Sequence, residues 1–90
     1  MMKRSEIPLY GIAVAAMLVD LPIATLRLYE AKGVLQPSRS EGGTRRYSDD
    51  DLARITRAGA LRERGVNMAG IKIILELEDE IARLNEKRGA

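Results

Sequence analysis

The chain contains no cysteine, histidine, tryptophan or phenylalanine, and its three aromatic residues are all tyrosines. The lack of Cys and His excludes zinc ribbons, thiol nucleophiles, disulfides and histidine acid–base chemistry. The sequence also has no phosphate-binding loop of the G-x-x-x-x-G-K-[ST] type and no paired carboxylates in an apolar context. We therefore expect no catalytic residues, no metal site and no cofactor, and we predict that the chain is not an enzyme.

What is present is the composition of one small folded domain with an aliphatic core. Of the 90 residues, 46% are hydrophobic and 31% are charged, and the net charge is +2. This mild positive charge permits a nucleic acid as partner without requiring one. A chain this short buries a modest core, which favours dimerisation as a further source of stability.

The longest apolar run, residues 11–19, follows Lys3 and Arg4 and so has some likeness to a secretory signal. Asp20 ends the run, which is too short to span a bilayer. We interpret it as the largely buried first helix of the domain. We expect a cytoplasmic protein with no membrane association.

The spacing of apolar residues, prolines and glycines predicts four helices and one small hairpin. Ser48 is placed to cap the third helix, with Asp51 closing a capping box, and Asn67 is placed to cap the fourth. In chain order, we expect a flexible arm over 1–8, helices over 13–19 and 22–32, a hairpin around Gly42-Gly43, and helices over 48–64 and 67–87.

This order is typical of a mainly α winged helix-turn-helix fold. The second helix would be the recognition helix, with Thr25 and Arg27 near base edges and the Tyr29 hydroxyl on a phosphate. A solvated Arg27 and a core Tyr29 are the alternative. We assign residues 9–72 to the DNA-binding domain and 73–90 to the start of a dimerisation helix.

The hairpin concentrates Arg39, Arg45 and Arg46, with Glu41 as the opposing charge. A basic hairpin beside a helix-turn-helix suits a wing that contacts phosphates or the minor groove. We expect Arg46 to reach DNA with Tyr47 beside it. An ion pair of Arg45 or Arg46 with Asp49 or Asp50 remains the alternative.

The fourth helix repeats apolar residues at intervals of three, four and three, which is coiled-coil spacing over only about two heptads. An amphipathic core helix explains the same pattern equally well. The candidate dimerisation residues are Ile74, Leu77, Ile81 and Leu84.

Several motifs together resemble the mercury-resistance regulator (MerR) family, whose pattern is approximately T-L-R-Y-Y-E, K-G-L, P-x-R and G-x-R-x-Y. The likeness extends from about Tyr10 to Leu77, and the combination is far more specific than any one piece. The motifs are Thr25-Leu26-Arg27-Leu28-Tyr29-Glu30, Lys32-Gly33-Val34-Leu35, Pro37-x-Arg39 and Gly43-Thr44-Arg45-Arg46-Tyr47-Ser48.

The resemblance implies a dimeric transcription regulator that binds an inverted-repeat operator in double-stranded DNA. Thr25, Arg27, Tyr29 and Lys32 would take recognition-helix roles, and Arg39, Arg45, Arg46 and Tyr47 would take wing roles. Tyr10 and Lys72 become candidate phosphate clamps. The wing and fourth helix are most similar to the heat-shock repressor (HspR) branch, which implies repression of chaperone genes with a chaperone as co-repressor.

The sequence departs from the family pattern where polar residues are usual, with Ala13, Pro22, Ile23 and Ala24 at helix starts. Fewer polar groups imply fewer base contacts and more reliance on the wing and on DNA shape. The sequence ends at Ala90 soon after the predicted dimer helix starts, so we expect a truncated chain or dependence on a partner. A promoter-spacing activator and a protein-interaction module for a chaperone or polymerase remain alternative functions.

Overall fold

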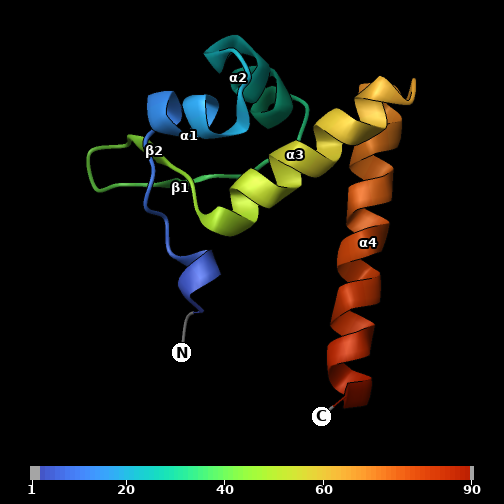
Figure 1. The fold of residues 1–90 in the computed structure, drawn as a ribbon. Helices are drawn as coiled ribbons and strands as arrows, with labels where there is room; N and C mark the ends of the chain where they lie inside the picture. Colours follow the sequence, from blue (N-terminus) through green and yellow to red (C-terminus); the bar gives the residue numbers. More distant parts are fainter. Residues whose placement is uncertain (1–2, 90) are drawn as a thin grey trace.

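The computed structural model describes residues 3–89 and places a small helical head beside one long helix (Figure 1). Two two-residue strands form an antiparallel hairpin at the edge of the head. The elements are η1 (Arg4–Glu6), α1 (Ile12–Val19), α2 (Ile23–Ala31), β1 (Ser38–Arg39), β2 (Arg45–Arg46), α3 (Asp49–Glu63) and α4 (Met68–Gly89). The predicted winged helix-turn-helix is confirmed.

The two predicted caps are also present. Ser48 Oγ accepts from the backbone N–H of Asp51 at 3.1 Å, and the Asp51 carboxylate accepts from the Ser48 N–H at 2.9 Å. Asn67 Oδ1 accepts from the backbone N–H of Gly70 at 2.8 Å. These bonds satisfy backbone donors that a helix start otherwise leaves unpaired, so both helices begin where the sequence predicts.

The core lies where α1, α2 and α3 meet the start of α4. Its largest fully buried side chains are those of Tyr29, Tyr47, Leu26, Leu35, Ile55, Ile71 and Val34. No helix among residues 3–89 is by itself both long and apolar enough to cross a membrane.

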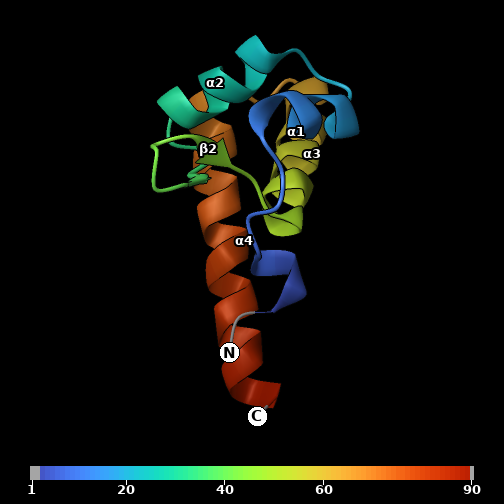
Figure 2. The same cartoon turned by 90° about the vertical axis from the view of Figure 1, so that its left-hand side faces the viewer.

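The prediction that α1 is largely buried is wrong. Ala15 and Ala16 are buried, but Val14, Met17 and Leu18 are exposed, Met17 at 71%. A helix of eight residues makes about two turns, and the rest of the head packs on one side of it (Figure 2). Its other side therefore faces outward although it is apolar.

The amino-terminal arm contains a 3₁₀ turn, η1, which packs near α3. Met1 and Met2, which belong to the predicted arm, lie outside the described residues. Beyond η1, Tyr10 pairs with Tyr47 as an isolated antiparallel bridge, so the chain entering α1 is bonded to the chain leaving the wing.

Candidate nucleic-acid interface

Helix α2, the predicted recognition helix, has an inner face of core residues and an outer face that is apolar apart from one cation. Leu26 and Tyr29 are buried, whereas Ile23, Arg27 and Leu28 are exposed. Among residues 3–89, Arg27 has no ion-pair partner. Arg27 is thus an exposed cation on α2, and its contact with a base edge stays a prediction.

The two other polar residues assigned to this helix lie at its margins. Thr25 is half-buried on the flank, and its backbone N–H donates to the carbonyl of Pro22 at 3.0 Å. Lys32 is exposed at the carboxyl end, where a positive charge is favoured by the helix dipole. Base contact by Thr25 and Lys32 stays a prediction.

Glu30 joins α2 to the hairpin formed by β1 and β2. Arg39 Nη2 donates to Glu30 Oε1 at 2.8 Å, and Arg45 Nε donates to Glu30 Oε2. Arg39 and Arg45 are paired across the hairpin, so their side chains share one face of the ribbon. One half-buried carboxylate therefore anchors both strands to α2, and sequence reasoning missed this contact because it counted Glu41 alone as the opposing charge.

Arg46 lies on the opposite face of the ribbon and is exposed, with no ion-pair partner among residues 3–89. A Cβ on Gly11 would stand 3.8 Å from Arg46 Nη1, so the guanidinium lies near the amino-terminal end of α1. The alternative pairing of Arg45 or Arg46 with Asp49 or Asp50 does not occur. Arg46 is thus an exposed cation of the wing, and its contact with a phosphate stays a prediction.

Tyr29 and Tyr47 require a correction, because the structure buries both rings, leaving them 1% and 0% exposed. Each packs in the core rather than toward a DNA surface. The Tyr47 hydroxyl has no hydrogen-bond partner among the described residues, and burial raises the pKa of this phenol. The predicted phosphate contact of Tyr29 and the predicted place of Tyr47 beside Arg46 on DNA are not supported.

The structure gives Tyr10 a contact within the protein, and its predicted clamp role stays a prediction. Its hydroxyl donates to Asp49 Oδ1 at 2.8 Å, and this hydrogen bond raises the pKa of the phenol above its usual value. The phenol proton is thus already used inside the protein. Tyr10 ties the chain before α1 to the start of α3, next to the backbone bridge with Tyr47.

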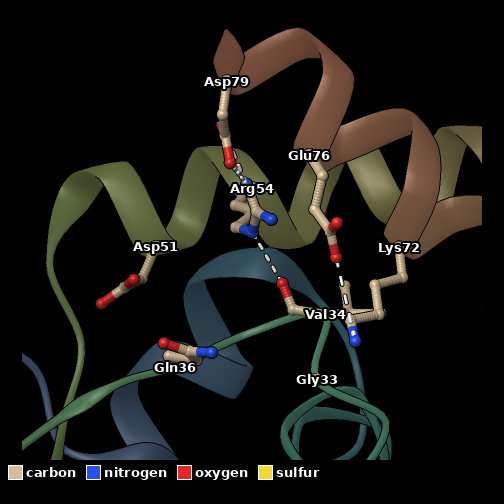
Figure 3. Close-up of a pocket in the computed structure, with 8 residues that line it drawn as sticks. All are labelled: Gly33, Val34, Gln36, Asp51, Arg54, Lys72, Glu76 and Asp79. Carbon is tan, nitrogen blue, oxygen red and sulfur yellow. Dashed lines mark hydrogen bonds and ion pairs between the residues drawn. The ribbon is translucent and has the colours of Figure 1, made fainter.

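The Lys72 side chain lies against Gly33, just after the carboxyl end of α2. A Cβ on Gly33 would lie 3.1 Å from Lys72 Cε, so Gly33, at φ +76°, gives room to this side chain. Lys72 Nζ lies 3.8 Å from Glu76 Oε1 (Figure 3). The amine is half-exposed and points past Gly33, and its role as a phosphate clamp stays a prediction.

Arg54 connects three parts of the chain in a pocket between the segment after α2, α3 and α4 (Figure 3). The pocket is lined by Gly33, Val34, Gln36, Asp51, Arg54, Lys72, Glu76 and Asp79. Its Nε donates to the carbonyl of Val34 at 2.6 Å, and its Nη1 donates to Asp79 Oδ2 at 2.9 Å. The segment after α2 is thereby tied to α3 and α4. No local signal predicts this contact, because its partners are 20 and 25 residues away.

The predicted dimerisation residues do not share one environment. Ile74 packs partly against the core, whereas Leu77, Ile81 and Leu84 are exposed. Ile73, which sequence reasoning missed, is 58% exposed and lies four residues before Leu77. We define the α4 seam as Ile73, Leu77, Ile81 and Leu84.

Comparisons with known proteins agree with this geometry. Residues 10–78 match the sequence model of the family described as MerR HTH family regulatory protein. The chain is 41% identical over 83 residues to the putative heat shock protein HspR of Streptomyces coelicolor, covering 91% of this chain and 55% of that one. It is 32% identical to the HTH-type transcriptional regulator GlnR of Bacillus cereus over 84% of this chain and 59% of GlnR. The chain thus spans little more than half of these relatives.

Solved structures give the same result. The promoter-DNA-bound HiNmlR, a MerR family regulator lacking the sensor domain, has a TM-score of 0.72 and 30% identity, over 89% of this chain and 67% of that one. The lead(II)-bound regulator PbrR691 of Ralstonia metallidurans has a TM-score of 0.71 and 26% identity, over 99% and 76%. With the family match over most of its length, this chain belongs to the MerR family of helix-turn-helix DNA-binding transcription regulators.

Proposed function

We propose that this chain represses heat-shock genes in the cytoplasm by binding an inverted-repeat operator as a homodimer. The observation that carries the heat-shock assignment is the 41% identity to HspR across both the recognition helix and the wing. The geometry supports the DNA-binding part, because the exposed Arg27 and the basic wing lie on neighbouring elements that Glu30 joins.

In this proposal, the residues divide into base-reading and phosphate-binding groups. Arg27 bonds a guanine edge in the major groove, where an arginine makes two hydrogen bonds to O6 and N7. Thr25 and Lys32 lie at the margins of the same helix. Arg46 contacts a phosphate regardless of sequence, and Arg39 and Arg45 hold the wing in place while adding positive charge.

The proposed homodimer forms through the α4 seam. Its apolar side chains face away from the head, and covering them with a second α4 removes apolar area from water. A two-fold dimer presents two recognition helices to two half-sites, which is why the operator is expected to be an inverted repeat. We also propose that a chaperone acts as co-repressor, by analogy with the heat-shock branch.

The test is capture of genomic fragments by the purified protein at moderate salt, followed by sequencing. An inverted repeat enriched upstream of chaperone genes supports the proposal. An inverted repeat enriched upstream of other genes would support a DNA-binding regulator but overturn the heat-shock assignment. Failure to enrich any fragment favours an interaction module that uses DNA little, and a flat salt dependence of DNA affinity would agree with that outcome.

A further inference from the structure

The outer face of α2 is unusual for a helix that meets a polyanion. Ile23 and Leu28 are 37% and 38% exposed, Ala24 is exposed between them, and Arg27 is the cation in their midst. The core is filled from the other side of α2 by Leu26 and Tyr29. Ile23 and Leu28 therefore each leave more than a third of their surface open to a partner.

The surroundings of this face indicate what covers it. Arg27 lies within it, Arg39 and Arg45 of the wing are anchored beside it through Glu30, and Lys32 ends the helix. An apolar protein surface or a lipid tail would have to bury Arg27 without a partner, which is costly. A negatively charged partner that carries apolar groups satisfies both the cation and the aliphatic side chains.

Duplex DNA offers one apolar group on its major-groove base edges, the C5-methyl of thymine. From residue 23 to residue 28 the helix rises about 7.5 Å, which corresponds to roughly two base-pair steps. The aliphatic side chains therefore have the reach to meet methyl groups on either side of the base pair that Arg27 contacts.

We propose that Ile23, Ala24 and Leu28 read thymine methyl groups that flank the guanine contacted by Arg27. The proposal rests on the DNA-binding function proposed above and adds the chemistry of its specificity. It also replaces the expectation that missing polar residues at the start of α2 reduce base readout. The aliphatic residues instead supply readout of a different kind.

The direct test replaces thymine by deoxyuridine in the enriched operator duplex. Deoxyuridine keeps every hydrogen-bonding group of thymine and lacks only the methyl. Loss of one methyl from an apolar contact lowers affinity about fourfold, or about 0.8 kcal/mol. Two contacts would give roughly 15-fold weaker binding of the uracil duplex.

Variants assign the effect to α2. The double variant Ile23→Ala, Leu28→Ala should reduce the ratio of thymine to uracil affinity toward one, because its side chains no longer reach the methyls. Arg46→Ala is the matched control: it should weaken both duplexes equally and leave the ratio unchanged. Thermal unfolding of each variant verifies that the head is folded.

The outcomes separate this proposal from the one on which it rests. Failure to bind any DNA overturns both. Operator binding with a thymine-to-uracil ratio of one overturns the methyl readout alone. A ratio that persists in the folded double variant also overturns it, because the discrimination would then arise from DNA shape or from other residues.

Discussion

The head and α4 use apolar side chains in opposite ways. In the head, Leu26 and Ile55 are 0% and 1% exposed, whereas Leu77 and Ile81 of the α4 seam are each 58% exposed. The head therefore gains the free energy of apolar burial within one chain. For the α4 seam, the same free energy becomes available only when another surface covers it.

The charged contacts of the two regions differ in the same sense. Glu30, with 20% of its side chain exposed, holds two arginines of the wing. By contrast, both side chains are exposed in the pair of Arg57 on α3 with Glu78 on α4, and in the Arg83–Glu80 pair within α4. Exposed pairs contribute little because water and salt screen them. The comparison therefore sets the buried contacts of the head, which extend to Ile71 and Leu75 at the start of α4, against the exposed apolar side chains of the α4 seam.

The largest expected effect is on the free energy of unfolding, which should fall far more for a variant of the head than for one of the α4 seam. Leu26→Ala should lower the free energy of unfolding by about 2–5 kcal/mol, because it leaves a cavity in a packed site. Leu77→Ala should change it by no more than about 0.5 kcal/mol when the protein is dilute enough to be monomeric. Chemical denaturation of both variants measures this, and equal losses would contradict the comparison.

The next largest effect should be on DNA affinity, which variants of the head and of α4 should change in different ways. Arg27→Ala should cost roughly 1–3 kcal/mol at any protein concentration and relax sequence preference, because a base contact is lost. Leu77→Asp places a charge in the α4 seam and should weaken binding only where the dimer dissociates, so higher concentration restores it. Operator titrations combined with sedimentation velocity test this. An Asp variant that remains dimeric yet binds weakly would refute the role of the seam.

Within the head, Glu30→Gln should loosen the wing and lower the free energy of unfolding by about 1 kcal/mol. The loss is small because the two arginines are partly exposed, and solvent screens their attraction to Glu30. Arg39 and Arg45 would lose their counter-charge, so binding to non-specific DNA should depend more steeply on salt. Glu41→Gln, at the exposed tip of the hairpin, is the matched control. If both variants give the same salt slope, Glu30 does not govern the charge of the wing.

The smallest effect concerns pH and the contact between α3 and α4. The hydrogen bond from Arg57 lowers the pKa of Glu78 in the folded chain. A lowered pKa adds stability above the ordinary pKa of a glutamate, and this contribution is lost as pH falls through the folded value. The Tm of the native chain should therefore fall slightly more between pH 5 and pH 3 than that of Glu78→Gln. Identical pH profiles would show that the pair contributes nothing.

Features governed by near neighbours in the sequence could be predicted. Ser48 with Asp51, and Asn67 with Gly70, are bonds across three residues, and the structure has both. The winged helix-turn-helix order follows from such signals together with the family motifs. Helix bounds and hairpin position were therefore accessible without any knowledge of packing.

Features that depend on distant partners could not be predicted. Glu30 joins arginines 9 and 15 residues away, and Arg54 reaches Asp79 across 25 residues. The burial of Tyr29 and Tyr47 could not be predicted either, because nothing in the sequence distinguishes a core Tyr47 from one that faces DNA. The choice between Ile73 and Ile74 on α4 likewise depended on how the helix rotates against α3.

The shared carboxylate of Glu30 has a consequence for redesign. Transplanting α2 alone into another protein would separate Glu30 from Arg39 and Arg45. The Glu30 carboxylate would then lie beside a hairpin that lacks its two arginine partners. Operator preference should therefore be exchanged as one cassette that runs from Ile23 through Arg46. Shorter swaps should give proteins that fold yet hold the wing at the wrong angle to the groove.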